Sequence, residues 1–291
     1  MLPSQRVSHK AVNNVSFTIK KDTIFGLVGE SGCGKTTLAR SILLLDPPTE
    51  GDILYNGTSL TKLSRKKLLP YRMKMQIVFQ DPHSALNPKM SIYKSMREGL
   101  VNKHFPKERI KARIEELLEL FGITPSHMHR FPHEFSGGQK QRIVIARALS
   151  MEPELLVLDE PVSNLDVSIQ AQIINLLLDL KEKFSLTYLF ISHDLNLVSY
   201  LCDRIGVMYQ GRIVELADTE DIMNTPLHPY TLKLFSSSPG AAEMGRQLQK
   251  DREDKDVLPE GYSFSGSDKG DRERFSLVSV TDSHFVGCYE K

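Results

Sequence analysis

The chain has 291 residues, of which 40% are hydrophobic and 25% are charged, and its formal net charge is +1 at pH 7. These values are ordinary for a globular protein, and the length allows a sizeable core in one or two domains. The near-neutral charge argues against attraction to nucleic acid or to a membrane surface by bulk electrostatics.

The three cysteines, Cys33, Cys202 and Cys288, are too few and too scattered for a disulfide framework or a zinc site. A reducing, intracellular compartment is therefore expected. No apolar run approaches the roughly 20 residues that span a bilayer. The first residues, MLPSQRVSHK, lack the apolar core of a signal peptide. We expect a protein that is soluble or that sits on a membrane only through partners.

The hydrophobic pattern predicts strands and helices that alternate along the chain. Strands are expected at residues 12–20, 23–29, 52–57, 75–80, 155–161 and 187–194, and a hairpin at 204–216. Helices are expected at 38–45, 168–184 and 228–235, and the region from 91 to 150 is expected to be predominantly helical. Strands that alternate with helices favour an α/β fold with a largely parallel sheet.

The composition changes after residue 235. The run QKDREDKD (249–256) is interpreted as a solvated linker in preference to a binding site. Short aromatic and β-branched segments at 261–264, 274–280 and 284–290 predict a small β appendage. We therefore divide the chain into a domain at 1–235 and a C-terminal extension at 236–291. No internal repeat is evident.

A complete phosphate-loop motif, G-x-x-x-x-G-K-[ST], follows the strand predicted at 23–29 and precedes a predicted helix. Glycines let backbone amides wrap closely around phosphate oxygens, lysine supplies a mobile positive charge, and the threonine hydroxyl suits Mg²⁺. The plain alternative is a glycine-rich turn, but the flanking elements favour nucleotide binding. Cys33 is interpreted as a spacer, since no histidine is paired with it to activate a nucleophile. The candidate nucleotide-binding residues are Gly29, Glu30, Ser31, Gly32, Cys33, Gly34, Lys35, Thr36 and Thr37.

Two acids, Asp159 and Glu160, end the apolar run LLVL. An acid at the tip of a core strand is suited to hold Mg²⁺ through water, and an adjacent acid can take a proton from an attacking water. The alternative is a solvated strand end, which the apolar character of the run disfavours.

A second glycine loop, FSGGQ (135–139), opens an apolar, arginine-containing helix. The amino end of a helix is a good anion site, because free amides and the helix dipole point the same way. A second such loop is explained if the nucleotide that it faces belongs to another molecule. FSGGQ, with the phosphate loop upstream and LDEPVSNLD and ISHD downstream, resembles the nucleotide-binding domain of the ABC transporter family, over about residues 10–235.

The resemblance implies a P-loop NTPase core with a mostly parallel sheet, an antiparallel β subdomain and an inserted α-helical subdomain at about 82–150. In that family two domains pair head to tail, and the signature loop of one closes over the ATP of the other. The signature residues here are Ser136, Gly137, Gly138 and Gln139.

The resemblance also assigns roles beyond the two glycine loops. Glu160 matches the general base, and His193 matches the histidine that touches the γ-phosphate. Gln80 matches the glutamine near the attacking water, and Asp166 matches the acid at the dimer seam. The Mg²⁺ ligands implied are Thr36, Gln80 and Asp159.

Four segments resemble the ATPases of dipeptide and oligopeptide importers; they are residues 79–92, 166–177, 188–198 and 228–235. The alternative is a nickel or metal-chelate importer of the same group. The resemblance implies an ATPase that uses ATP and Mg²⁺ at the cytoplasmic face of the cell membrane. The implied partners are two permeases, an external substrate-binding protein and a sister ATPase, with a heterodimer favoured over a homodimer and no nucleic acid.

Three features depart from the family pattern. Members carry an upstream aromatic residue that stacks on adenine, and here no aromatic residue precedes Phe17. Some relatives have a C-terminal cysteine cluster, whereas this tail has only Cys288, so no iron–sulphur cluster is expected. Phe135 replaces the leucine that most often precedes the signature serine.

Two other classes of ABC protein are alternatives. ABC ATPases that act on DNA carry a long coiled coil, and those that act on ribosomes carry two nucleotide domains in one chain; neither feature is found here. A subunit that binds ATP without hydrolysis is the other alternative. It is disfavoured because Glu160, Gln80 and His193 are all present.

Overall fold

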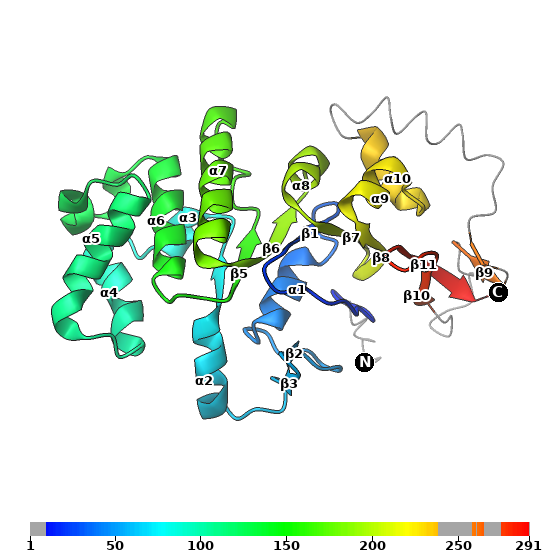
Figure 1. The fold of residues 1–291 in the computed structure, drawn as a ribbon, viewed down its shortest axis with the longest axis horizontal. Coiled ribbons are helices and arrows are strands. Elements are labelled where there is room, and N and C mark those ends of the chain that lie inside the picture. Colours follow the sequence, from blue (N-terminus) through cyan, green and yellow to red (C-terminus); the bar gives the residue numbers. More distant parts are fainter. Residues whose placement is uncertain (1–9, 238–257, 260, 265–274, 291) are drawn as a thin grey trace, which may run out of the picture. The chain divides into compact units, whose positions relative to one another are not determined.

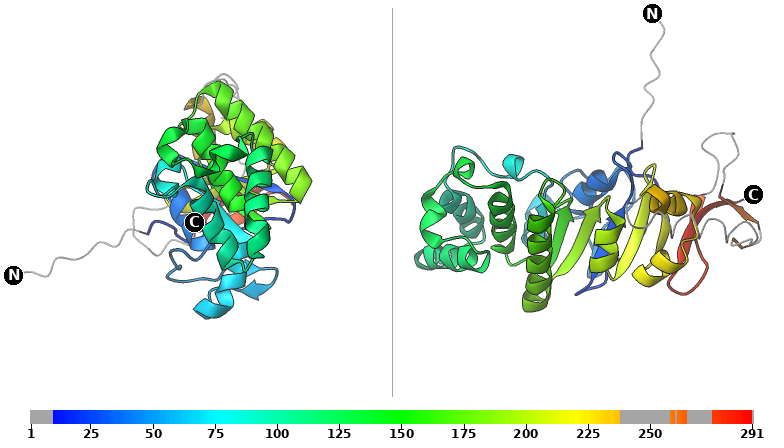
Figure 2. Two further views of the ribbon diagram at one scale, coloured as in Figure 1. Left: turned by 90° about the vertical axis from the view of Figure 1, so that its left-hand side faces the viewer. Right: turned by 90° about the horizontal axis from the view of Figure 1, so that it is seen from above.

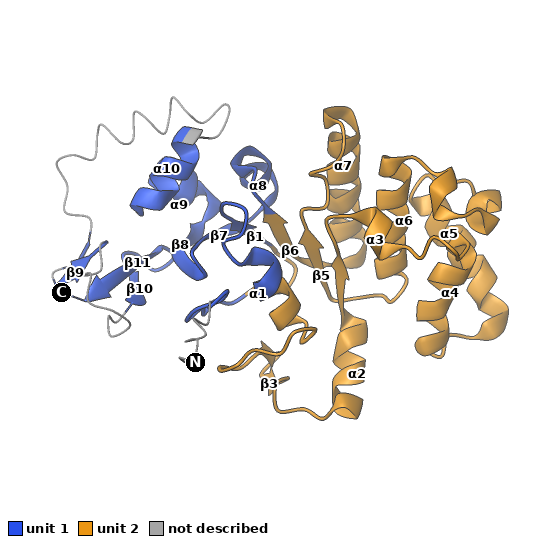
Figure 3. Ribbon diagram, turned by 180° about the vertical axis from the view of Figure 1, so that it is seen from behind, with its two compact units in different colours: residues 1–18, 25–38, 192–291 blue, residues 19–24, 39–191 orange. Residues whose placement is uncertain are grey.

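The computed structural model describes residues 10–237, 258–259, 261–264 and 275–290 (Figure 1). The chain forms two compact units, which Figure 3 colours separately. Unit 1 comprises residues 1–18, 25–38 and 192–291, and unit 2 comprises residues 19–24 and 39–191. The predicted linker at 249–256 lies outside the described residues.

Unit 2 is built on three parallel strands in the order β6-β5-β4, so the carboxyl ends of all three lie at one edge. β5 and β6 are buried along nearly their whole length. That burial explains their continuous apolar sequences, which are typical of parallel strands covered on both faces. The strands are β2 (Leu54–Tyr55), β3 (Thr58–Ser59), β4 (Met75–Val78), β5 (Leu155–Asp159) and β6 (Thr187–Ser192). The two-residue strands β2 and β3 form the hairpin expected at 52–57.

The region from 91 to 150 is helical, as predicted, and Figure 2 shows its helices gathered to one side of the strands of unit 2. Each of the three long helices in this region buries an apolar face. The α-helices of the unit are α2 (Arg65–Lys74), α3 (Pro82–Ala85), α4 (Ile92–Asn102), α5 (Ile110–Leu120), α6 (Gly137–Leu149) and α7 (Val167–Phe184). Short 3₁₀ helices lie at η1 (Lys107–Arg109), η2 (Pro125–His129) and η3 (Pro132–Glu134).

Unit 1 contains a mixed sheet in the order β10-β11-β8-β7-β1, in which β1 and β7 are parallel and the other pairs are antiparallel. β9 pairs with β11. The strands are β1 (Ile24–Val28), β7 (Arg204–Tyr209), β8 (Arg212–Asp218), β9 (Tyr262–Ser263), β10 (Phe275–Ser279) and β11 (Phe285–Glu290). The helices are α1 (Lys35–Ile42), of which residues 35–38 belong to this unit, α8 (Leu195–Leu201), α9 (Thr219–Asn224) and α10 (Pro229–Ser237).

The C-terminal β segments join the sheet of unit 1. β11 pairs with β8, with Phe285 opposite Leu216 and Val286 opposite Glu215. The hairpin of β10 and β11 therefore extends the sheet that contains β1 and β7. Through this pairing the last described residues are fixed to the same sheet as the strand that precedes the phosphate loop.

The prediction of a strand at 12–20 was wrong, because the structure has no strand there. Burial alternates along the segment as the pattern predicted, and Phe17 stacks on Phe25 with ring centroids 4.9 Å apart. The segment is nevertheless held by isolated contacts, such as the Asn14 amide that donates to the carbonyl of Phe275. Alternation reports which side chains are buried, whereas a strand also needs a regular hydrogen-bonded neighbour.

Among the helices that the structure describes, none combines the length and the apolar content needed to cross a membrane.

Candidate nucleotide site

The phosphate loop of unit 1 joins the buried strand β1 to helix α1, which begins at Lys35. Gly29 and Gly34 have φ angles of 153° and 111°, a region that residues with a Cβ rarely adopt. A Cβ on Gly29 would lie 2.2 Å from the carbonyl oxygen of Met208, and one on Gly34 would lie 2.2 Å from that of Ala11. Glycine is therefore required at both positions. Without side chains there, backbone N–H groups of the loop can approach a phosphate closely.

The Lys35 side chain is folded onto its own loop. It is 6% exposed, and its Nζ donates to the carbonyls of Gly29 and Glu30 at 2.7 and 3.0 Å. The ammonium group is thus held at the loop by backbone oxygens. Phosphate oxygens offer a stronger, charged acceptor for the same group.

Cys33 is buried within the loop, and burial raises the pKa of its thiol although Lys35 acts in the opposite direction. A thiol that stays protonated is a poor nucleophile, which agrees with a spacer role. A cavity of about 610 Å³ lies against the outer face of the loop and is lined in part by Ser31, Gly32 and Lys10.

In unit 2, the ends of β4 and β5 bring polar side chains together. Val78 lies opposite Leu158 in the parallel pair, so the residues that follow both strands meet at one edge. There the Gln80 side-chain amide donates from Nε2 to Oε2 of Glu160 at 2.9 Å and to Oγ of Ser163 at 3.4 Å. Asp159, the last residue of β5, is 3% exposed, and Gln80 is exposed.

The backbone at Glu160 is unusual. Its φ is 47°, in the left-handed region that costs a residue with a Cβ on the order of 1 kcal/mol. Its N–H donates to the carbonyl of Ile191 at 3.0 Å, which continues the pairing of β5 with β6 by one residue. The carboxylate of Glu160 is thereby turned at the strand end toward Gln80. Ser163, which donates to the carbonyl of Glu160 at 3.2 Å, belongs to this cluster and was not singled out from the sequence.

The signature segment forms the amino end of α6. Ser136 is the N-cap, and its Oγ accepts from the N–H of Gln139 at 3.3 Å, while Oε1 of Gln139 accepts from the N–H of Ser136 at 3.0 Å. This reciprocal arrangement is a capping box. Ser136 and Gly137 are exposed, so the positive end of the α6 dipole is open to an anion.

Gly138 packs closely against the start of α7. A Cβ there would lie 2.7 Å from Cγ2 of Ile169, whereas one on Gly137 would make an ordinary contact with Leu165 at 3.6 Å. The two signature glycines therefore differ: Gly138 allows two helices to approach, whereas a Cβ at Gly137 would fit beside Leu165.

Asp166 is exposed at the N-cap position of α7, next to Val167, whose side chain is 81% exposed. The turn before α7 is held by Gln170, whose Nε2 donates to the carbonyls of Val162 and Leu165 at 3.1 and 2.9 Å. Gln170 lies within the segment 166–177, and the sequence predicted no role for it.

His193 belongs to unit 1 and is exposed directly after β6. The next residue, Asp194, caps α8 by accepting from the N–H groups of Asn196 and Leu197 at 2.9 and 3.3 Å. The structure thus brings Gln80, Glu160 and Ser163 together in unit 2. The phosphate loop and His193 lie in unit 1, and each set is described within its own unit.

The candidate metal ligands are oxygen donors: a threonine hydroxyl, a glutamine amide and an aspartate carboxylate. Such hard donors suit Mg²⁺ and do not suit zinc or other thiophilic metals. In the described part of the chain, no group of three or more His, Cys, Asp or Glu side chains is placed to hold a metal ion. Each donor fits Mg²⁺ by its chemistry; Thr36 lies in unit 1, and Gln80 and Asp159 lie in unit 2.

A buried strand, a glycine loop with a buried lysine, paired acids and a capped SGGQ helix together define a nucleotide-binding cassette. A sequence model of the ABC transporter family matches residues 12–163, and one described as the oligopeptide/dipeptide transporter C-terminal region matches residues 214–265. The chain belongs to the ABC transporter family, and it is an ATP-binding protein and an ATPase of that type.

The chain is 47% identical over 285 residues to the oligopeptide transport ATP-binding protein OppF of Bacillus subtilis, with 97% of this chain and 90% of that protein covered. It is 51% identical over 239 residues to AppF of the same organism, with coverage of 81% and 72%. A solved dimer of the ATP-binding cassette MJ0796 bound to ADP and Pi matches with a TM-score of 0.65 and 28% identity, over 72% of this chain and 90% of that one. These findings confirm the predicted ABC-type α/β fold.

Proposed function

We propose that this chain is the ATPase subunit of an importer of di- and oligopeptides. The observation that carries this proposal is the similarity to OppF over 97% of the chain, which extends through the C-terminal region common to such proteins. The relatives named above are oligopeptide transport proteins. They give no support to the alternative of a nickel or metal-chelate importer.

The proposed residue roles are those that the resemblance to the family implies, and the local geometry supports them. The phosphate loop, from Gly29 to Thr37, binds the phosphates of ATP, and the Lys35 ammonium moves from loop carbonyls onto phosphate oxygens. Thr36, Gln80 and Asp159 supply oxygen ligands to Mg²⁺. When bound, Mg²⁺ neutralises charge on the phosphates and orients them for attack.

Glu160 is the general base that takes a proton from the attacking water. The hydrogen bond from Nε2 of Gln80 orients the carboxylate of Glu160. The other amide atom of Gln80, Oε1, is then the one that would ligate the metal or accept from the water. His193 donates to the γ-phosphate. In the proposed site, His193 and Lys35 are the donors that stabilise charge developing on the transferred phosphoryl group, and such stabilisation is the main source of catalysis in these reactions.

The second half of each site comes from a partner cassette. Ser136, Gly137, Gly138 and Gln139 of one cassette close over the ATP held by the other, with Asp166 at the seam. The open amino end of α6 and the exposed Val167 support this role, because they offer an anion site and an apolar contact on one surface. We favour a pair of two different cassettes.

The pair drives two permeases, which receive peptide from an external substrate-binding protein. The cassette sits at the cytoplasmic face of the membrane and is held there through the permeases. ATP binding closes the pair and hydrolysis releases it, so nucleotide chemistry acts as a switch on the permeases.

The first test measures the association of the Glu160→Gln variant by size-exclusion chromatography, with and without Mg·ATP. This variant keeps the size of the side chain but removes the base, so ATP should accumulate and hold cassettes together. Adding Ser136→Arg should abolish that association, because the arginine fills the phosphate-facing end of α6.

A matched control is Ser64→Arg. Ser64 is also an exposed helix N-cap, that of α2, and its side chain makes no cap hydrogen bond. We expect Ser64→Arg to leave ATP-driven association unchanged. Loss of association in both arginine variants would mean that added charge, and not the signature loop, is responsible.

The choice between cassette pairs is tested by co-expressing Glu160→Gln with a second, different cassette. Tighter association in the mixed sample than of the chain alone supports the heterodimer, and equal or weaker association in the mixed sample contradicts it. The peptide cargo is tested in cells that lack their own peptide-importer ATPase. Restored growth on peptides as the sole source of a required amino acid supports the proposal, and continued failure by a well-expressed chain opposes it.

A further inference from the structure

One aromatic hydroxyl reaches the phosphate loop from a distant part of the chain. Tyr230 lies in the first turn of α10, is 6% exposed, and accepts through Oη from the N–H of Glu30 at 2.9 Å. The two residues are 200 positions apart. A second residue of α10, Lys233, places Nζ 4.0 Å from the Glu30 carboxylate. That exposed ion pair is weak by comparison, since surface pairs are screened by water and salt.

The hydrogen bond is made to a particular peptide group. The N–H of Glu30 and the C=O of Gly29 belong to one peptide unit, and in a trans peptide they point in opposite directions. The carbonyl of that unit is the closest acceptor of Lys35, at 2.7 Å from Nζ. Tyr230 and Lys35 therefore hold the same peptide unit from its two ends.

Tyr230 is itself firmly held. Its ring packs on that of Tyr209 with centroids 4.2 Å apart, and its N–H donates to Nδ1 of His228 at 3.1 Å. A tyrosine restrained at ring and backbone has little freedom to leave the loop. Burial raises the pKa of Tyr230 to about 12, so its hydroxyl stays neutral at physiological pH.

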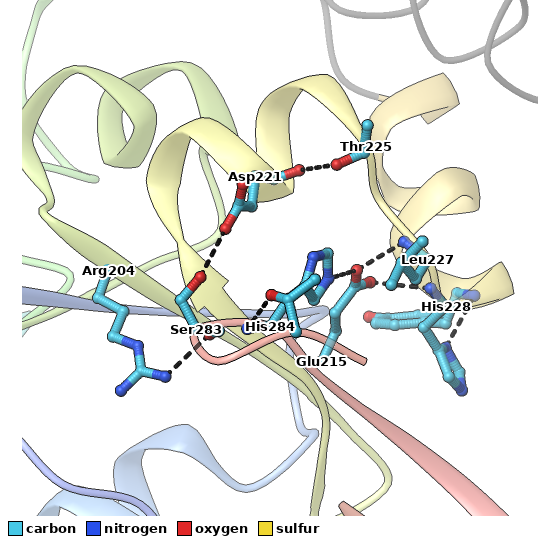
Figure 4. Close-up of polar contacts among 10 residues, drawn as sticks. Arg204, Glu215, Asp221, Thr225, Leu227, His228, Ser283 and His284 are labelled. Carbon is cyan, nitrogen blue, oxygen red and sulfur yellow. Dashed lines mark hydrogen bonds and ion pairs between the residues drawn. The ribbon is translucent and has the colours of Figure 1, made fainter. Parts of the chain in front are cut away.

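The start of α10 is fixed in turn by a buried carboxylate. Glu215 of β8 is fully buried, and its two oxygens accept from the N–H groups of Leu227 and His228 at 2.6 and 2.9 Å. Nε2 of His284, from the turn between β10 and β11, lies 2.7 Å from Oε1 of the same carboxylate. Figure 4 shows Glu215 at the centre of these contacts, between His284 on one side and the chain leading into α10 on the other.

We propose that Tyr230 is a positioning residue for nucleotide binding: it fixes the Gly29–Glu30 peptide unit and thereby places the Lys35 ammonium for the phosphates. The inference rests on the phosphate loop being the nucleotide site. The motif of the phosphate loop contains no residue of the C-terminal region, and the contact of Tyr230 with Glu30 adds one. Without the hydroxyl, the peptide unit rotates more freely and the binding-competent loop is less populated, which lowers the apparent affinity by the same fraction.

The test compares Tyr230→Phe with Tyr209→Phe. The first change removes the hydroxyl at the loop and keeps the ring that packs on Tyr209. The second removes the other hydroxyl of the ring pair, whose contact is with Nε2 of the exposed Gln210 at 3.1 Å and not with the loop. Three quantities are measured for each: thermal unfolding, hydrogen exchange of the Glu30 amide, and equilibrium binding of a fluorescent ADP analogue.

In Tyr230→Phe we expect faster exchange at Glu30 and nucleotide affinity lower by roughly threefold to tenfold, the range for loss of one hydrogen bond. Tyr209→Phe should match the wild type in both measurements. Faster exchange with unchanged affinity would overturn the positioning role and leave Tyr230 as a purely structural contact. Unchanged exchange would show that the hydroxyl does not hold the loop.

A folding defect is distinguished by the thermal midpoint. If Tyr230→Phe lowers it by more than Tyr209→Phe, exchange and binding of all three proteins are measured well below the lower midpoint, where each chain is folded. A loss of affinity that persists there, with exchange faster at Glu30 than at amides elsewhere, supports the positioning role, and a uniform rise in exchange contradicts it. If the wild-type chain does not bind nucleotide at all, the proposed nucleotide site is refuted. If the wild-type chain binds and Tyr230→Phe has the same affinity, only the positioning role of Tyr230 is refuted.

Discussion

At the scale of single residues, the three glycines of the phosphate loop serve the same motif for different physical reasons. Gly29 and Gly34 have no room for a Cβ, because carbonyl oxygens lie 2.2 Å from where it would stand. Gly32 faces open space, but its φ of 81° is one that other residues adopt with strain. The spacing of the motif identifies all three glycines. Only the structure shows that lack of space requires glycine at two of them and backbone conformation at the third.

This difference is measurable as stability. We expect Gly32→Ala to lower the free energy of unfolding by about 1–2 kcal/mol, the cost of a left-handed backbone at alanine. Gly34→Ala should lower it by more and should also abolish nucleotide binding, because the clash with Ala11 forces the loop to move. Denaturant unfolding of the two variants side by side checks the order, and equal losses would show that the clash is relieved without cost.

At the scale of elements, helix α6 is positioned by its glycines as well as by its capping box. Gly138 faces Ile169 of α7 with no space for a methyl group, and Gly137 has space. Helix propensity alone favours alanine over glycine at both positions by about 1 kcal/mol. Packing reverses this preference at Gly138 only.

We therefore predict that Gly138→Ala destabilises the protein by about 1–3 kcal/mol, the usual cost of overpacking. The double variant Gly138→Ala/Ile169→Ala should recover part of that loss, because the clashing methyl group is removed. Gly137→Ala is the matched control, with stability unchanged or slightly raised but ATP-driven association weakened. A double-mutant cycle from chemical unfolding measures the coupling, and additive effects would contradict the proposed contact.

A second element-scale feature is the attachment of α10 and the C-terminal hairpin to β8. Glu215 accepts two backbone N–H groups and contacts His284; Glu215, His228 and His284 are buried, and Leu227 is half-buried. Glu215→Ala leaves the donors buried without an acceptor, and we expect a loss of about 3 kcal/mol or more in the free energy of unfolding.

Glu220→Ala is the control for loss of a carboxylate, because Glu220 is exposed in the first turn of α9. Its loss should stay below about 1 kcal/mol, the range for an acid near a helix amino end. Guanidinium unfolding distinguishes the two variants. A small effect of Glu215→Ala would mean that water satisfies the same donors.

At the scale of the whole molecule, the chain is a cassette whose stability depends on its nucleotide. A ligand that binds only the folded state adds RT ln(1 + [L]/Kd), or about 2.7 kcal/mol at a hundredfold excess over Kd. If Thr36, Gln80 and Asp159 are Mg²⁺ ligands, as proposed, that gain depends on Mg²⁺, because the metal compensates the charge of the phosphates.

Removal of the metal is therefore expected to reduce the gain. Mg·ATP should raise the unfolding midpoint of Glu160→Gln, and adding excess EDTA at the same ATP concentration should return the midpoint most of the way to its nucleotide-free value. EDTA without ATP is the control and should change nothing. A midpoint that ATP raises equally with and without Mg²⁺ would contradict the proposed metal ligands.

The sequence by itself determined most of the elements and the local form of both glycine loops. The phosphate loop and the hairpin at 204–216 depend on residues a few positions apart, so spacing and residue type are sufficient to predict them. The same reasoning failed at 12–20, where side-chain alternation was correct but no neighbouring strand completed a ladder.

Only the tertiary structure decided which distant groups meet. Gln80 reaches Glu160 across 80 residues, Glu215 reaches His284 across 69, and Tyr230 reaches Glu30 across 200. Each contact depends on strand order, register and the position of a helix start, and no local sequence pattern predicts these features. The motifs identified an ATP-binding cassette, whereas the link between its C-terminal region and its phosphate loop became visible only when the chain was folded.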